Sequence, residues 1–76
     1  MSERRRLAEL PLGTRAKVVE VAGDPDAARR LMDMGVTRGA TVEVMRLAPL
    51  GDPMEVRIRG FMLTLRRSEA EHITVE

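Results

Sequence analysis

Few side chains in this sequence could carry out covalent chemistry. The chain has one histidine, His72, and no cysteine, so a thiolate nucleophile is excluded. Its serines, Ser2 and Ser68, have no spacing to His72 that is typical of nucleophilic catalysis. The six glycines form neither a phosphate-binding loop nor a dinucleotide fingerprint. The sequence therefore predicts a protein that is not an enzyme and that uses no cofactor.

Metal binding is the next chemistry to consider. His72 has two carboxylates near it in the sequence, Glu69 and Glu76. One imidazole with scattered carboxylates does not make a specific cage for a transition metal. We therefore predict no dedicated metal site in the monomer. The alternative is a metal-responsive module, in which these three side chains bind a divalent ion between two copies of the chain.

The arginines suggest a third possibility, a nucleic-acid-binding barrel. Arg57, Arg59 and Arg66 are predicted to face outward, with Arg46 and Arg67 nearby. Barrels that bind single strands usually add aromatic stacking platforms. The only aromatic residue here is Phe61, which the strand pattern predicts to point inward. The arginines are therefore better explained as a solvated face, and we predict no nucleic-acid partner.

Length and composition favour one small folded domain spanning residues 1–76. The chain is 43% hydrophobic and 33% charged, which is typical of a globular protein. Residues 1–6 are expected to form a loose end that Leu7 and Leu10 tie to the core. The formal net charge is only +1, and no apolar run is long enough to span a bilayer. We expect a cytoplasmic protein with no segment inserted in a membrane.

Side-chain periodicity predicts a mainly β protein. A helix is expected to begin at Asp24 and Pro25, with Ala28, Leu31 and Met32 facing the core, and to end at Gly35. Met34 lies off this apolar stripe and is predicted to be exposed. Ser68 and Glu71 match a capping box for one helical turn. Five strands are predicted at residues 15–22, 41–48, 54–59, 61–66 and 73–76.

The strand patterns also predict which side chains face the core. Residues 54–59 alternate most cleanly, with Met54, Val56 and Ile58 inward. Adjacent valines at 18 and 19 break the alternation of the first strand and suggest a bulge or burial on both faces. In the fourth strand Phe61, Leu63 and Leu65 are predicted inward. Five short antiparallel strands with one helix favour a small, partly closed SH3-like barrel.

Several ordered motifs covering nearly the whole chain give it a resemblance to a known family. They are Leu7-x-x-Leu10-x-x-Gly13-x-x-Ala16-x-Val18, Arg30-Leu31-Met32-Asp33-Met34-Gly35 followed by Gly39, Ala48-Pro49-Leu50-Gly51-Asp52-Pro53, Arg59-Gly60, and Leu65-Arg66-Arg67-x-Glu69-Ala70-x-x-Ile73. In this order and spacing the chain resembles bacterial ferrous iron transport protein A, FeoA. It departs from the family pattern at Arg38, where proline is common, and in its arginine-rich start.

The resemblance implies an SH3-like barrel in the cytoplasm that assists FeoB, the membrane transporter of ferrous iron. It does not imply that the chain itself binds iron or GTP. No DNA-binding helix-turn-helix precedes the barrel, which argues against a metal-dependent repressor with a related C-terminal fold. Activation or inhibition of the transporter and weak self-association are both left open. The residues predicted to contact the partner are Met34, Gly35, Pro49, Leu50, Gly51, Asp52 and Pro53.

Overall fold

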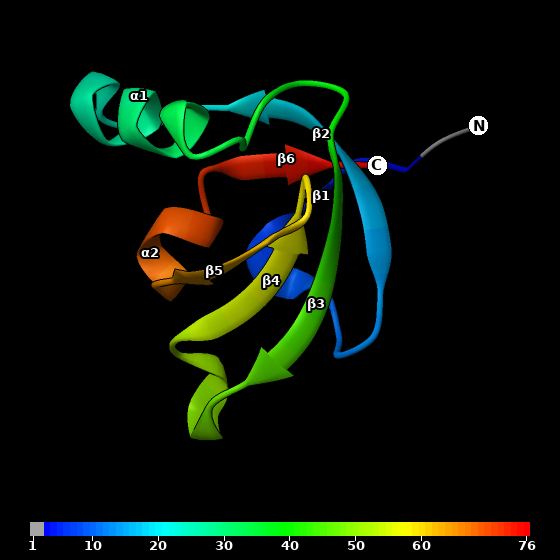
Figure 1. The fold of residues 1–76 in the computed structure, drawn as a ribbon. Helices are drawn as coiled ribbons and strands as arrows, with labels where there is room; N and C mark the ends of the chain where they lie inside the picture. Colours follow the sequence, from blue (N-terminus) through cyan, green and yellow to red (C-terminus); the bar gives the residue numbers. More distant parts are fainter. Residues whose placement is uncertain (1–2) are drawn as a thin grey trace.

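A computed structural model describes residues 3–76 and shows a strongly curved antiparallel sheet (Figure 1). Its strands follow the spatial order β1-β6-β2-β3-β4-β5, which leaves β1 and β5 at the two edges. Met1 and Ser2, the start of the predicted loose end, lie outside the described residues. The strands are β1 Arg5–Arg6, β2 Arg15–Val21, β3 Thr41–Leu47, β4 Met54–Ile58, β5 Phe61–Leu65 and β6 Ile73–Val75.

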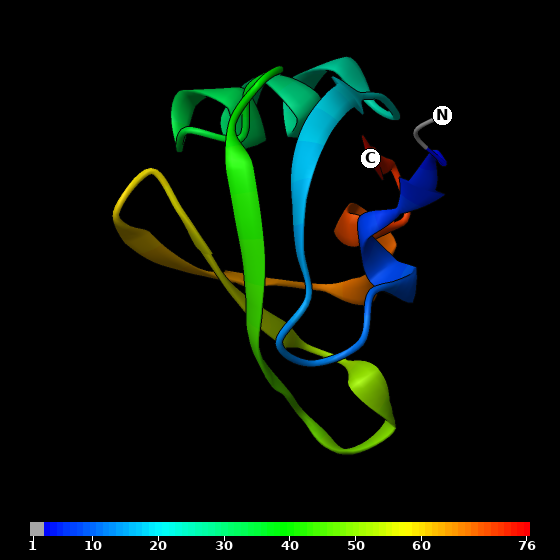
Figure 2. The ribbon, with the colours of Figure 1, turned by 90° about the vertical axis from the view of Figure 1, so that its right-hand side faces the viewer.

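The helix α1, Pro25–Asp33, lies across one end of the barrel (Figure 2). Its start is as predicted, because the Asp24 carboxylate accepts a hydrogen bond from the Ala27 N–H at 3.1 Å and Pro25 occupies the first turn. Gly35 follows the helix with a φ of +102°, the left-handed conformation that favours glycine. Shorter helical segments are η1 Leu7–Glu9, η2 Pro49–Gly51 and α2 Arg67–Ala70.

Within residues 3–76 the sheet has six strands, where the sequence predicted about five. The additional strand is β1, in which Arg5 pairs with Val75 and Arg6 with Thr74 of β6. Arg6 also donates a side-chain hydrogen bond to the Glu71 carbonyl at 2.8 Å. The prediction of a loose end is therefore wrong for these two arginines. Backbone hydrogen bonds join a strand to the edge of a sheet, so charged side chains that stay in solvent do not prevent the pairing.

The core confirms most of the predicted inward faces. Met54, Val56 and Ile58 of β4 are each at most 1% exposed, and Leu7, the first residue of η1, is fully buried. The irregularity predicted for residues 15–22 is present in β2, because the register of its pairing with β6 shifts between Val18 and Glu20. Leu10, Ala28, Leu31, Val42, Val44, Leu65, Ala70, Ile73 and Val75 are also buried. One apolar core therefore fills the barrel beneath α1.

Three predicted positions are wrong. Met32 is 43% exposed, because α1 covers only the end of the barrel and turns this side chain to solvent. Phe61 is 64% exposed, because it begins β5 beside the hairpin turn, where the strand extends beyond the core. The predicted capping box is also shifted. Glu69 rather than Glu71 caps α2, accepting from the Arg66 N–H at 2.9 Å, because the helix starts at Arg67 directly after β5.

Candidate functional site

The turn between β4 and β5 is tied to the end of α1. Arg59 and Gly60 have φ values of +50° and +81°, as a two-residue hairpin turn of the favoured kind requires. The Arg59 guanidinium donates to the Thr37 hydroxyl at 2.7 Å and to the Gly35 carbonyl at 3.2 Å. A single side chain thus joins the hairpin tip to the segment that follows the helix.

Between these two segments lies an apolar groove, which we call the β5 groove. Its volume is about 340 Å³, and its walls are residues 33–35 on one side and Arg59 with residues 61–63 on the other. Three exposed apolar side chains line it: Met34, 37% exposed, Met62, 52% exposed, and Phe61. Single exposed apolar side chains are normal on a protein surface, whereas several gathered in one groove are typical of a binding site.

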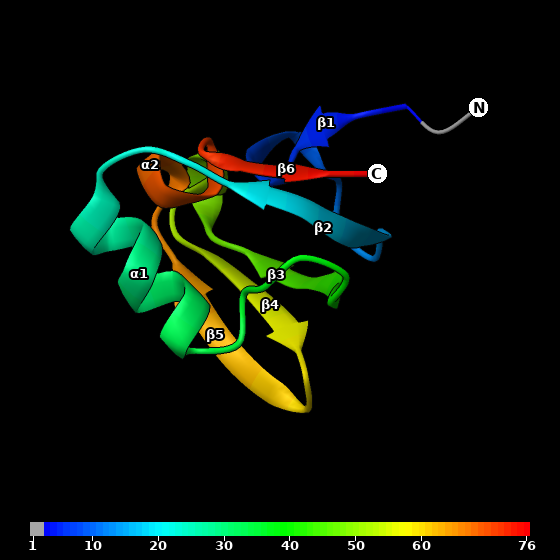
Figure 3. The ribbon, with the colours of Figure 1, turned by 90° about the horizontal axis from the view of Figure 1, so that it is seen from above.

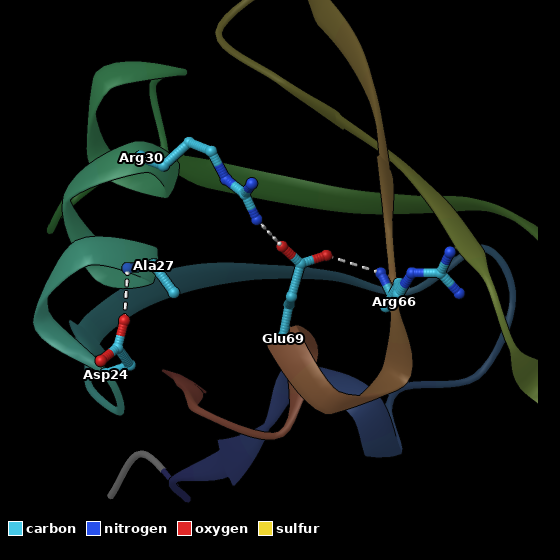
Figure 4. Close-up of polar contacts among 5 residues, drawn as sticks. All are labelled: Asp24, Ala27, Arg30, Arg66 and Glu69. Atoms are coloured by element: carbon cyan, nitrogen blue, oxygen red, sulfur yellow. Dashed lines mark hydrogen bonds and ion pairs between the residues drawn. The ribbon is translucent and has the colours of Figure 1, made fainter.

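A second cleft, of about 520 Å³, continues from the β5 groove past Met34 toward α2. Three charged side chains surround it, and Figure 4 shows how they are connected. Glu69 accepts from Arg30 Nη2 at 2.9 Å through one carboxylate oxygen and from the Arg66 N–H at 2.9 Å through the other. This carboxylate therefore connects α1 to the residue between β5 and α2.

The structure separates the residues predicted to contact a partner into two groups. Met34 and Gly35 line the β5 groove, and Pro53 lines the adjoining cleft together with Met34. The η2 segment lies at the end of the barrel opposite α1 (Figure 1). Leu50 there is 97% exposed and reaches neither cleft. One continuous surface therefore includes the helix end and Pro53 but not the tip of the loop.

Asp52 has a structural role that the sequence did not reveal. Its Oδ1 accepts a hydrogen bond from the backbone N–H of Arg67, at 3.1 Å, at the first residue of α2. The first N–H groups of a helix have no partner within the helix, so a carboxylate from another segment can satisfy one of them. The loop of residues 49–53 thus holds α2 in place besides connecting β3 to β4.

The three metal candidates do not come together as a set, although Glu69 and His72 line the same pocket beside α1. Glu69 is paired with Arg30, Glu76 with Arg4 at 3.5 Å, and His72 packs beside Gly23. Within residues 3–76 no group of three His, Asp or Glu side chains is placed to hold a metal ion. The predicted arginine stripe is also incomplete as a free surface, because the guanidinium of Arg59 bonds to the residues after α1 and that of Arg67 to Glu71.

Sequence reasoning missed Phe61 and Met62 as groove residues. Strict alternation assigned Phe61 to the core and left the role of Met62 open. Three successive apolar residues, 61–63, were the available signal, because an alternating strand can point only every second side chain inward. At least one large apolar side chain had to face away from the core.

These features define an SH3-like barrel with an exposed apolar groove beside one edge strand. A model of the FeoA domain family matches residues 5–76 of the chain. The chain therefore belongs to the FeoA family. No helix within residues 3–76 is long and apolar enough to cross a membrane.

Known proteins agree with this assignment. The solution structure of the FeoA protein of Chlorobium tepidum is 56% identical to this chain with a TM-score of 0.89, and the match covers 95% of this chain and 69% of that one. Figure 3 shows the fold of the present chain from above. The Stenotrophomonas maltophilia FeoA, solved in complex with zinc and described as an SH3 domain protein, is 36% identical to this chain with a TM-score of 0.81. The match covers 95% of this chain and 89% of that one.

A curated relative from Porphyromonas gingivalis has a different organisation. It is a fusion of Fe(2+) transport protein A with the Fe(2+) transporter FeoB, and it is 41% identical to this chain over 71 residues. The match covers 93% of this chain but only 8% of the fusion protein. The chain thus corresponds to a small part of that protein, and the family is linked to ferrous iron transport.

Proposed function

We propose that this protein is a non-enzymatic cytosolic accessory protein that docks on the cytosolic region of a FeoB-type transporter and modulates its assembly or activity. The observation that carries the proposal is the Porphyromonas gingivalis relative, in which a FeoA segment and FeoB form one chain. Covalent fusion raises the effective concentration of two modules for each other. Such a fusion is expected when the separate proteins work as a pair.

The surface of the barrel supports a binding role. The β5 groove offers exposed apolar side chains, Met34, Phe61 and Met62, on a framework of strands and a capped helix. A partner that covers them gains apolar burial without first having to order a loop, because Arg59 already holds the groove walls together.

Binding is tested by calorimetric titration of the purified protein with the transporter's cytosolic region and with the intact transporter. We expect saturable binding that Met62→Ser weakens about tenfold, as for a well-buried contact residue. Leu12→Ser is the matched control, because Leu12 is also exposed, at 61%, but lines neither cleft. The proposal is wrong if the protein binds neither the cytosolic region nor the intact transporter and if its deletion leaves ferrous uptake unchanged.

A further inference from the structure

The strand β5 is an open edge of the sheet. Ile58 and Phe61 flank the two-residue turn and form the first pair of the β4–β5 ladder. In an antiparallel ladder every second residue bonds to the neighbouring strand, so Phe61, Leu63 and Leu65 bond to β4. The backbone groups of Met62 and Thr64 therefore point away from β4. In the described part of the chain they form no further backbone hydrogen bond.

This open edge borders both clefts. Met62 lines the β5 groove, Thr64 lines the adjoining cleft, and Met34 of the helix end lies opposite both. An extended chain placed along β5 would find backbone donors and acceptors on one side and apolar surface on the other. That combination is typical of strand addition, in which backbone bonds give affinity and side-chain pockets give specificity.

The charges around β5 indicate which occupant fits. Arg57 and Arg59 precede the strand, and Arg66 and Arg67 follow it. In an antiparallel pair of two copies the start of one β5 meets the end of the other, so arginines would lie opposite arginines. Like charges placed opposite each other destabilise a strand pair. A second copy of this chain is therefore a poor occupant.

The same arginines suit a segment that carries a carboxylate. Arg59 and Arg66 form no ion pair with a carboxylate within residues 3–76. Asp33 provides a negative charge in the groove that Arg59 lines. The adjoining cleft is lined by Arg30 and Arg66 but by one carboxylate, Glu69, which already pairs with Arg30 at 2.9 Å. The uncompensated positive charge is consequently greater at the Arg66 end.

We propose that β5 accepts an extended segment of the partner protein as an additional strand. The segment bonds to the backbone of Met62 and Thr64, places apolar side chains against Met34 and Phe61, and pairs a carboxylate with Arg66. This mode of contact rests on the docking function proposed above and specifies the surface used. The contact itself requires only the barrel and an extended peptide, so it can be tested without the transporter.

The first test uses isotope-labelled protein and a short blocked peptide of alternating valine and glutamate, followed by NMR. We expect shifts at the Met62 and Thr64 amides, slower hydrogen exchange there, and weaker binding of a matched valine and lysine peptide. Absence of binding at millimolar peptide, equal binding of the two peptides, or shifts confined to other strands would each overturn the proposal.

The second test compares Thr64→Pro with Thr64→Val. Proline removes the outward N–H without breaking the β4 ladder, since edge strands tolerate proline where the donor faces solvent. Valine retains the donor. We expect Thr64→Pro to bind the transporter's cytosolic region about tenfold more weakly than Thr64→Val, which keeps the same N–H donor. Exchange protection in the wild-type protein provides a readout that does not depend on the folding of either variant.

These outcomes separate the two proposals. If the wild-type protein binds the transporter region and both variants bind equally well, strand addition is wrong and docking holds. If the wild-type protein does not bind the transporter at all, the docking function is wrong, and the peptide titration alone decides whether β5 accepts a strand.

Discussion

The contact between the β4–β5 turn and the end of α1 provides a quantitative test of how the groove walls are held. Arg59 has a φ of +50° and donates hydrogen bonds to the Gly35 carbonyl and the Thr37 hydroxyl. Asparagine tolerates the left-handed conformation better than most residues. The substitution Arg59→Asn therefore removes the guanidinium contacts while keeping the turn.

The expected loss follows from the geometry. A net hydrogen bond contributes about 0.5–1.5 kcal/mol, and bonds of exposed groups contribute at the lower end. Arg59 bonds to two partners and is exposed, so we expect Arg59→Asn to lower the free energy of unfolding by about 1 kcal/mol. For a domain of 76 residues this corresponds to a fall in Tm of about 4–8 °C.

Urea unfolding of a double-mutant cycle with Thr37→Val measures the contact itself. If Arg59 acts through the Thr37 hydroxyl, the double variant loses less stability than the sum of the single variants, by about 0.5 kcal/mol or more. Additive losses would refute this reasoning. Arg59→Gly is a useful comparison, because it removes the same contacts and also relieves the positive φ.

Three further tests, each by chemical unfolding of substituted proteins, address other parts of the structure. Gly23→Ala is expected to lower the free energy of unfolding by more than Gly39→Ala. Both glycines have a positive φ, but a Cβ at Gly23 would lie 2.9 Å from His72 Cγ, whereas a Cβ at Gly39 would meet open space. Ile73→Ala, at a fully buried position, should cost about 2–5 kcal/mol and leave much of this small domain unfolded. Glu69→Ala should cost about 1 kcal/mol, because the carboxylate caps α2 as well as pairing with Arg30. Equal losses at the two glycines, a loss below 1 kcal/mol at Ile73, or no loss at Glu69 would contradict these assignments.

The elements that local chemistry determines could be predicted from the sequence. The Asp24 cap, the glycine stop of α1 and the inward face of β4 all follow from residues within a few positions of one another. The number of short strands and the single helix also favoured the SH3-like arrangement, and the family resemblance, carried by ordered motifs along the chain, added the link to ferrous iron transport.

The features that depend on distant segments could not be predicted in the same way. The pairing of β1 with β6 joins the two ends of the chain, and the Asp52 cap of α2 joins a loop to a helix 15 residues away. The exposure of Phe61 depends on how far the β4–β5 hairpin extends beyond the core, which no local pattern encodes. The β5 groove was predicted only in part, from Met34 and Gly35, because its other wall comes from that hairpin.

The most direct measurement of the central claim is amide hydrogen exchange of the full chain, alone and saturated with the transporter's cytosolic region. We predict that the Met62 and Thr64 amides exchange freely in the isolated protein and become protected in the complex, while β1 at the opposite edge changes little. Formation of a complex in which these two amides stay unprotected would contradict docking through β5.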